Sequence, residues 1–354
     1  MIPLAQVLRR HWPAYERKFG ARLLPSHRRA VQAIVSCRTP ALGAQLFACS
    51  CGQYQWVYHS CNHRACPRCG QADASQWLDR QRRRLLPVPY YLVTFTVPEQ
   101  LRPILRSNQK ILYPLLIRES AGALCDVGLQ HKDLGAQLGI LAVLQTWARD
   151  LHYHPHVHCV VPGGGLSPDG LRWVRPKSPG FFLPQAVLAA RLRSRLKHAL
   201  QQDHPHLLAQ IPSIAWHKDW VADVQPVGSG EPALKYLSAY VYRTALSSEK
   251  ILADNSRGIT FKYRDNTGSD RTLTLTAERF LHRFLQHVLP AGLQRVRYFG
   301  WLSPAAKARF DRIRALLDAP QLPPPLPAPA LVPECPCCHK PMLLIGRLPR
   351  PPPQ

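Results

Sequence analysis

Two histidines separated by a single apolar residue are the first feature of this chain that could support chemistry. Residues 151–158 contain four histidines, and the last two form the pair His156-Val157-His158. On a β-strand, residues i and i+2 project from the same face, and neutral imidazole is the most common protein ligand of divalent metals. The pattern therefore predicts that His156 and His158 hold one divalent ion between them.

A pair of tyrosines further along the chain could supply a nucleophile. Tyr236 and Tyr240 lie four residues apart in segment 235–243, whose composition predicts a helix, so both phenols could face one site. A phenol with an ordinary pKa of about 10 is a poor nucleophile at neutral pH. A metal bound to a phosphate oxygen would make the phosphorus more electrophilic. Histidines on a sheet and tyrosines on a helix thus indicate transesterification of a phosphodiester.

Six of the eleven cysteines gather in residues 37–70, which indicates a zinc module. Two paired turns, Cys49-Ser-Cys51-Gly52 and Cys66-Pro-Arg-Cys69-Gly70, are typical of knuckles that hold a tetrahedral Zn²⁺. A closed site with four ligands would be structural, because it leaves no open position for chemistry. The expected zinc ligands are Cys49, Cys51, Cys66 and Cys69. Because the first turn is one residue short of the usual gap, the alternative ligands are Cys37, Cys61, His59 and His63.

The charge of the chain points to a polyanionic partner. Its 354 residues include 46 Lys and Arg against 21 Asp and Glu, a net charge of +25, so nucleic acid is the first interpretation. The chain has no run of 18 apolar residues, which a transmembrane helix would require. Residues 1–20 lack the apolar core of a signal peptide. We therefore expect a cytoplasmic protein without membrane contacts, in which cysteines bind metal rather than form disulfides.

The pattern of elements predicts three consecutive regions. Residues 1–86 should form a helical, zinc-binding and DNA-binding module, and residues 87–300 an α+β catalytic domain. Residues 301–354 should be a helix and a proline-rich tail in which Cys335 and Cys338 form a lone pair. That pair would either complete a site elsewhere or stay empty. Within 72–300, strands are expected at 90–97, 138–147, 155–161, 221–227, 258–263 and 273–275, and helices at 72–86, 101–116, 184–200 and 277–288.

In this order, the cysteine cluster, histidine strand and tyrosine helix resemble the transposases of the insertion sequence 91 family, a group of HUH endonucleases. The combination is far more specific than any single motif, and the matching segments span residues 37–300. They are Cys37-Arg-Thr-Pro-Ala-Leu-Gly43, Ser60-Cys-Asn-His-Arg-Ala-Cys-Pro-Arg-Cys69, His154-Pro-His-Val-His158, Lys235-Tyr-Leu-Ser-Ala-Tyr-Val-Tyr-Arg243, Arg279-Phe-Leu-His-Arg-Phe-Leu-Gln-His-Val-Leu-Pro290 and Arg297-Tyr-Phe-Gly300.

The resemblance implies a ferredoxin-like antiparallel sheet with flanking helices, and a Mg²⁺ or Mn²⁺ ion at His156 and His158 on a central strand. Members of the family have one or two catalytic tyrosines, and this sequence keeps both Tyr236 and Tyr240. The cysteine module corresponds to the family's region for structural Zn²⁺, although its shortened first turn departs from the pattern. In related enzymes a third polar side chain completes the metal site, for which the candidates here are Gln145, Asp150, His152 and His154.

The implied function is rolling-circle transposition. The enzyme would nick single-stranded DNA at the ends of the element, form a 5′-phosphotyrosine and transfer the strand, in a bacterial cytoplasm at the nucleoid. Host replication proteins are candidate partners, and the basic segments 80–84 and 191–197 would follow the DNA backbone. The alternatives are a zinc-finger DNA-binding regulator without catalysis, a replication initiator or relaxase with the same chemistry, and a hydrolase that forms no covalent intermediate.

Overall fold

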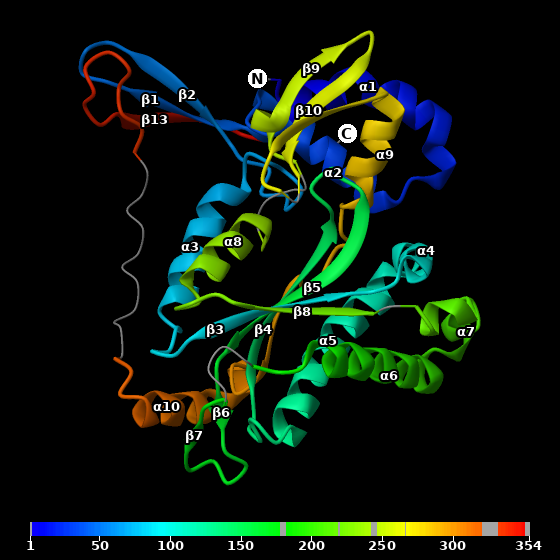
Figure 1. The fold of residues 1–354 in the computed structure, drawn as a ribbon. Helices are drawn as coiled ribbons and strands as arrows, with labels where there is room; N and C mark the ends of the chain where they lie inside the picture. Colours follow the sequence, from blue (N-terminus) through cyan, green and yellow to red (C-terminus); the bar gives the residue numbers. More distant parts are fainter. Residues whose placement is uncertain are drawn as a thin grey trace. The chain divides into compact units, whose positions relative to one another are not determined.

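The computed structural model describes residues 2–177, 182–218, 220–241, 246–265, 267–320 and 332–350 (Figure 1). The chain divides into two compact units, each built from separated segments. The first unit contains Met1–Ser75, Tyr242–Val288 and Pro324–Gln354, and the second contains Gln76–Val241 and Leu289–Pro323. This division differs from the consecutive regions 1–86, 87–300 and 301–354 that we predicted, because strands and a helix from late in the chain pack with N-terminal elements.

A five-stranded antiparallel sheet forms the centre of the second unit. Its order is β12-β4-β5-β3-β8, so β5 is the central strand. The α+β class and the antiparallel sheet predicted from the sequence are confirmed. The strands are β3 (Tyr90–Thr96), β4 (Gly139–Trp147), β5 (Tyr153–Pro162), β8 (Val221–Pro226) and β12 (Val296–Gly300).

Alternation along β5 gives the sheet one apolar and one polar face in this region. Every second residue is buried in the main hydrophobic core, namely Val157, Cys159 and Val161. Helices α5 (Gln109–Gln130) and α6 (Gln185–Asp203) cover that apolar face (Figure 1). Because successive side chains in a strand point to opposite faces, His156 and His158 project from the other side of the sheet.

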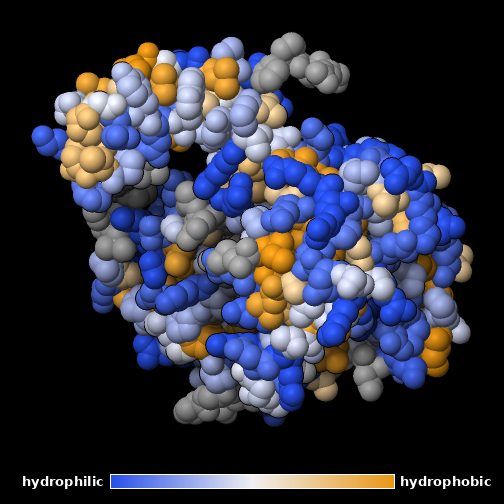
Figure 2. Space-filling model, turned by 90° about the horizontal axis from the view of Figure 1, so that it is seen from above, coloured by the Kyte–Doolittle hydropathy of each residue, from blue (hydrophilic) through white to orange (hydrophobic). Residues whose placement is uncertain are grey.

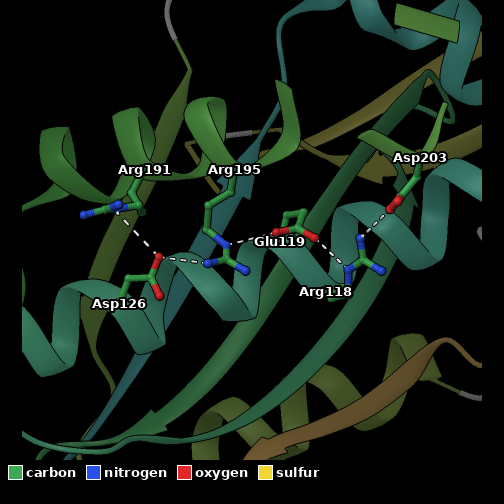
Figure 3. A network of polar contacts seen from close by, with 6 residues as sticks. All are labelled: Arg118, Glu119, Asp126, Arg191, Arg195 and Asp203. Carbon is green, nitrogen blue, oxygen red and sulfur yellow. Dashed lines mark hydrogen bonds and ion pairs between the residues drawn. The ribbon is translucent and has the colours of Figure 1, made fainter. Parts of the chain in front are cut away.

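A network of ion pairs joins α5 to α6 (Figure 3). The Arg195 guanidinium contacts Glu119 Oε2 through Nε at 2.9 Å and Asp126 Oδ2 through Nη1 at 2.8 Å. Glu119 is buried, and Arg118 Nε also lies 2.6 Å from its Oε1. Arg191 takes part through a longer contact with Asp126. We predicted that the segment 191–197 follows DNA. Its residues Arg191 and Arg195 instead pair with carboxylates of α5.

Substitution of Arg195 by leucine is expected to destabilise the protein by about 2–4 kcal/mol, because it leaves the buried Glu119 carboxylate with one guanidinium. The matched control is Arg191→Leu. It removes a 3.9 Å contact with Asp126 and a hydrogen bond to Gln130 Oε1, both made by a more exposed side chain, and should cost less than about 1 kcal/mol. Urea unfolding of both variants measures the difference. Equal stabilities of the two variants would contradict this account of the network.

In the first unit, N-terminal helices pack with a hairpin-rich segment from late in the chain. Helices α1 (Leu4–Phe19) and α2 (Pro25–Ser36) lie with the sheet β11-β10-β9 and helix α9 (Ala277–Gln286). His11 Nε2 of α1 lies 2.8 Å from Asp254 Oδ1, and Lys18 Nζ lies 2.8 Å from Glu278 Oε1. The sheet strands are β9 (Ile251–Asn255), β10 (Gly258–Arg264) and β11 (Asp270–Leu275).

The first unit also contains a three-stranded antiparallel sheet, in which a strand from late in the chain pairs with an N-terminal hairpin. Its order is β13-β1-β2, with β1 at Ala44–Ala48, β2 at Tyr54–Tyr58 and β13 at Leu343–Leu348 (Figure 1). The register pairs Ala44 with Leu348 and Ala48 with Leu343. We had predicted an extended proline-rich tail here. The segment that forms β13 has no proline, so its backbone N–H groups can complete the ladder.

The remaining helices are α3 (Gly70–Arg82), α4 (Arg102–Ser107), α7 (Pro205–Leu208), α8 (Glu231–Val241) and α10 (Lys307–Leu316), and β6 (Gly165–Leu166) pairs with β7 (Trp173–Val174). The helix predicted at 101–116 is split at Asn108, and its second part extends to Gln130. Among the described residues, no helix has the length and apolarity that crossing a membrane requires. Hydrophilic side chains dominate the face in Figure 2, and hydrophobic ones form small separate groups.

Candidate active site

Three neighbouring strands bring polar side chains to the face of the sheet that carries the histidines. The register places Gln145 of β4 opposite His156 and Thr94 of β3 opposite His158. Residues paired directly across an antiparallel ladder project from the same face. Thr96 of β3 also lies opposite His156, so the central position of β5 gives its two histidines polar neighbours on both sides.

In each imidazole one ring nitrogen has a partner that fixes the ring, and the other nitrogen is the candidate metal ligand. His156 Nδ1 donates to the backbone oxygen of His154 at 2.6 Å, so its Nε2 is the available ligand atom. His158 Nδ1 lies 2.9 Å from Thr94 Oγ1, and its Nε2 lies 3.2 Å from Gln145 Oε1. The ring centroids of His156 and His158 are 4.7 Å apart. In metal sites the second ring nitrogen of a histidine is normally held by such a carbonyl or hydroxyl partner.

Burial keeps both imidazoles neutral at physiological pH. Loss of solvation lowers the pKa of His156 to about 4 and lowers the pKa of His158 well below its ordinary value. A neutral imidazole retains the lone pair that a metal requires. The electrostatic state of the pair therefore fits metal ligation.

Gln145 is the best placed of the four candidates for the third ligand. Its Nε2 donates to the backbone oxygen of Trp147 at 3.1 Å, which turns Oε1 towards His158. His154 shares the histidine face of β5, with its ring 5.2 Å from that of His156. Asp150 and His152 instead contact each other. Two imidazole nitrogens and one amide oxygen form a donor set that can hold a divalent metal ion.

Helix α8 places one of the expected nucleophiles beside the histidines. The ring of Tyr236 stands perpendicular to that of His158, with 5.8 Å between the centroids. The side chain of Tyr236 is 41% exposed, so its phenol can be reached from solvent. The side chain of Tyr240 and all of Tyr242 lie outside the described residues.

Two residues near this site were missed by the sequence analysis. Thr94 fixes the ring of His158, but nothing in its local sequence distinguishes it from other strand threonines. Arg102, at the start of α4, lies close to the histidines: burial is the main cause of the lowered pKa of His154 and His156, and the charge of Arg102 lowers both further. A guanidinium in this place can contact a phosphate oxygen.

The cysteines form two groups of four, each with all its sulfur atoms within 4.8 Å of one another. In the first group, Cys66 and Cys69 of the second knuckle lie with Cys37 and Cys61, the two cysteines named as alternative ligands. The Sγ–Sγ distances are 3.4 Å for Cys37–Cys69 and 3.6 Å for Cys61–Cys69. Its members are Cys37, Cys61, Cys66 and Cys69. Four thiolates at about 2.3 Å from Zn²⁺ would lie about 3.8 Å apart, so this group fits a zinc ion.

The first knuckle, Cys49 and Cys51, does not join Cys66 and Cys69, although the spacing had grouped them. It lies with Cys335 and Cys338 in the second group. The reason is the β1–β2 hairpin, which has the first knuckle in its turn, whereas Cys37 and Cys61 lie beyond the opposite ends of its strands. Five strand residues span about 17 Å, too far for one ion. Among the described residues, neither His59 nor His63 belongs to a group.

Comparisons with known proteins identify the family of this chain. Residues 7–97 match a family model described as "Transposase zinc-binding domain", and residues 139–309 match one described as "Putative transposase". The chain is 34% identical to "Putative transposase y4qJ" of Sinorhizobium fredii, over 95% of this chain and 93% of that protein. It is 28% identical to "Transposase for insertion sequence element IS801" of Pseudomonas savastanoi pv. phaseolicola, over 85% and 76% of the two chains. No solved structure matches.

Proposed function

Because this chain belongs to the insertion sequence 91 family of transposases, with an N-terminal zinc-binding domain, we propose that it cuts and joins DNA through a covalent bond to Tyr236. A transposase acts on DNA, and the net charge of +25 suits that partner. The observation that carries the proposal is the approach of the Tyr236 ring to His158. Phenol and imidazoles are then close enough to act on one phosphate.

In the proposed reaction, the phenolic oxygen of Tyr236 attacks the scissile phosphorus. A bond forms between phosphorus and the phenolic oxygen, the bond to the 3′-oxygen of the neighbouring nucleotide breaks, and the phenol proton is lost while the leaving oxygen gains one. The products are a 5′-phosphotyrosine and a free 3′-OH. A divalent ion held by His156, His158 and Gln145 would polarise the phosphate and offset its developing charge.

The covalent intermediate also explains how strands can be joined without ATP. The phosphodiester bond that breaks is replaced by a phosphotyrosine bond, so a 3′-OH from another strand can reverse the reaction and release the phenol. Arg102, beside His154 and His156, would hold a phosphate oxygen during both steps. Tyr240, four residues along the same helix, would permit a second cut while the first strand end remains attached.

A row of exposed aromatic residues on β2 supports a preference for single strands. Tyr54 and Trp56 are 68% and 45% exposed, and Tyr58 follows at the next alternate position, so the three side chains share one face of the sheet. Residues 37–70 contain three arginines and no carboxylate. Aromatic rings in a basic surface stack on unpaired bases, which duplex DNA does not offer.

Segment 80–84, at the end of α3, was expected to follow the DNA backbone, but two of its arginines have contacts within the protein. Arg82 pairs with Asp79 and, at 2.7 Å, with Glu231. Arg84, just beyond the helix, donates to the backbone oxygen of Leu302 and lies over the ring of Tyr298. These contacts weaken the sequence-based assignment of segment 80–84 to phosphate binding and leave the β2 row as the better supported DNA contact.

The proposal is tested with single-stranded oligonucleotides that span the element ends, incubated with the full-length protein and Mn²⁺. An oligonucleotide labelled at its 3′ end should become attached to the protein in denaturing gels, whereas a 5′ label should appear on a shorter free strand. The matched negative control is the double variant Tyr236→Phe, Tyr240→Phe. An adduct that survives in that variant refutes the tyrosine mechanism, cleavage without any adduct supports a hydrolase, and binding without cleavage supports a regulator.

Substitution of Thr94 by valine should weaken Mn²⁺ binding about tenfold, because the His158 ring loses the hydroxyl that holds its Nδ1. The valine is nearly isosteric, so the sheet should be preserved. Thr96→Val is the control. Thr96 is on the same strand but lies opposite His156, whose Nδ1 is held by the backbone oxygen of His154 instead. Titration of the two variants with Mn²⁺ separates them, and equal affinities would show that Thr94 does not orient a metal ligand.

A further inference from the structure

We propose that the chain holds a second Zn²⁺ ion between Cys49, Cys51, Cys335 and Cys338, and that this ion fastens the C-terminal segment 332–350 to the N-terminal hairpin. The zinc-binding family model covers residues 7–97, so it includes the first two of these cysteines and neither of the last two. The site therefore joins residues of that domain to a segment nearly 240 residues beyond its end.

The positions of the four sulfur atoms fit a tetrahedral ion. The Sγ–Sγ distances are 3.4 Å for Cys49–Cys338, 3.5 Å for Cys51–Cys335 and 3.6 Å for Cys51–Cys338. A disulfide would bring two sulfurs to about 2.05 Å, whereas a Zn²⁺ with four thiolates separates them by about 3.8 Å. All three distances therefore match a shared metal rather than disulfides, and all four cysteines are free thiols.

The backbone at both pairs of cysteines has the form of a zinc knuckle. Gly52 follows the first pair with a φ of +87°, a left-handed conformation that lets the chain turn beneath the sulfurs. At the second pair, the Cys337 N–H group donates to Cys335 Sγ at 3.4 Å. His339, which follows, also has a left-handed φ, of +60°. The two turns thus present four sulfurs to one point from opposite segments of the chain.

Ordinary packing does not account for the cluster. Among the described residues, its small hydrophobic core contains Phe47 and Met342 besides the cysteines. Cys51 is exposed, unlike a cysteine that serves as a core residue. On β13, the exposed residues include Leu343 and Ile345, so the strand buries little of its own apolar surface. A structural zinc ion supplies folding energy directly, which would compensate for this small core.

Without the ion, β13 would be held to β1 mainly by the backbone hydrogen bonds of one short strand pair. Such a pair is marginally stable in water unless a core or a metal supports it. We therefore expect segment 332–350 to detach from the hairpin when this zinc is removed. The inference concerns the assembly of the first unit and holds whether or not Tyr236 is the nucleophile.

The test measures the zinc content of the purified full-length chain by elemental analysis. The native protein should contain two zinc ions per chain, and the double variant Cys335→Ser, Cys338→Ser should contain one. The matched control is Cys337→Ser, because Cys337 lies between these residues, is exposed and does not belong to the group; it should retain two ions. One zinc in the native chain, or two in the double variant, would overturn the proposal.

A second measurement applies even if the double variant folds poorly. Treatment of the native chain with a limited amount of chelator, followed by brief proteolysis and mass spectrometry, should reveal new cleavage within residues 332–350, and added Zn²⁺ should restore protection. The Cys337→Ser variant should behave like the native chain. Cleavage of this segment at the same rate with and without zinc would show that the ion does not hold it to the β1–β2 hairpin.

Discussion

Substitution of Tyr236 by phenylalanine is expected to lower the rate of covalent adduct formation by roughly 10³-fold or more, because it removes the attacking oxygen and preserves the ring. Binding of the single-stranded oligonucleotide should stay within about twofold, since a phenyl ring packs in the same space. Single-turnover measurement of adduct formation, with saturating protein and Mn²⁺, determines the change directly.

The matched control for this prediction is Tyr54→Phe. Tyr54 is also exposed, but it lies on the β2 row, where only the aromatic ring is needed for stacking. Its adduct formation should be close to that of the native chain. If Tyr236→Phe retained the adduct and Tyr240→Phe lost it, the nucleophile would lie one helical turn further along α8, and the assignment to Tyr236 would be wrong.

Substitution of His158 by alanine should have a comparably large effect, but through the metal. The variant should bind Mn²⁺ at least about 100-fold more weakly, because one of the two imidazole ligands is lost. Adduct formation should fall with it, by about 10³-fold at Mn²⁺ concentrations that saturate the native protein. Metal binding is measured by electron paramagnetic resonance of free Mn²⁺, which does not depend on DNA or on catalysis.

His152→Ala is the control for the loss of an imidazole in the same segment. His152 is exposed and contacts Asp150 rather than the pair on β5, so its removal should leave Mn²⁺ affinity within about twofold. Circular dichroism would establish that the His158→Ala variant keeps its sheet. Unchanged Mn²⁺ binding in a folded His158→Ala variant would mean that the two histidines are ordinary buried residues and not ligands.

The sequence by itself was sufficient for features that depend on neighbouring residues. The apolar, β-branched residues of 155–161 predicted a strand with His156 and His158 on one face, and the pattern of 235–243 predicted the helix that carries Tyr236. The pattern of elements predicted the α+β class, and the resemblance to the insertion sequence 91 family implied the antiparallel sheet and the transposase family. The strand and the helix are local in origin, because side-chain periodicity and helix propensity act over a few residues.

Only the tertiary structure decided which distant residues meet. The cysteine spacing grouped Cys49 and Cys51 with the second knuckle, but the length of the β1–β2 hairpin separates them and strand β13 brings Cys335 and Cys338 to them instead. In the same way, the register of β3 and β4 against β5, which no local pattern reveals, selected Thr94 and Gln145 as neighbours of the histidines. Strand pairing and ion ligation join segments of any sequence separation, so spacing along the chain constrains them weakly.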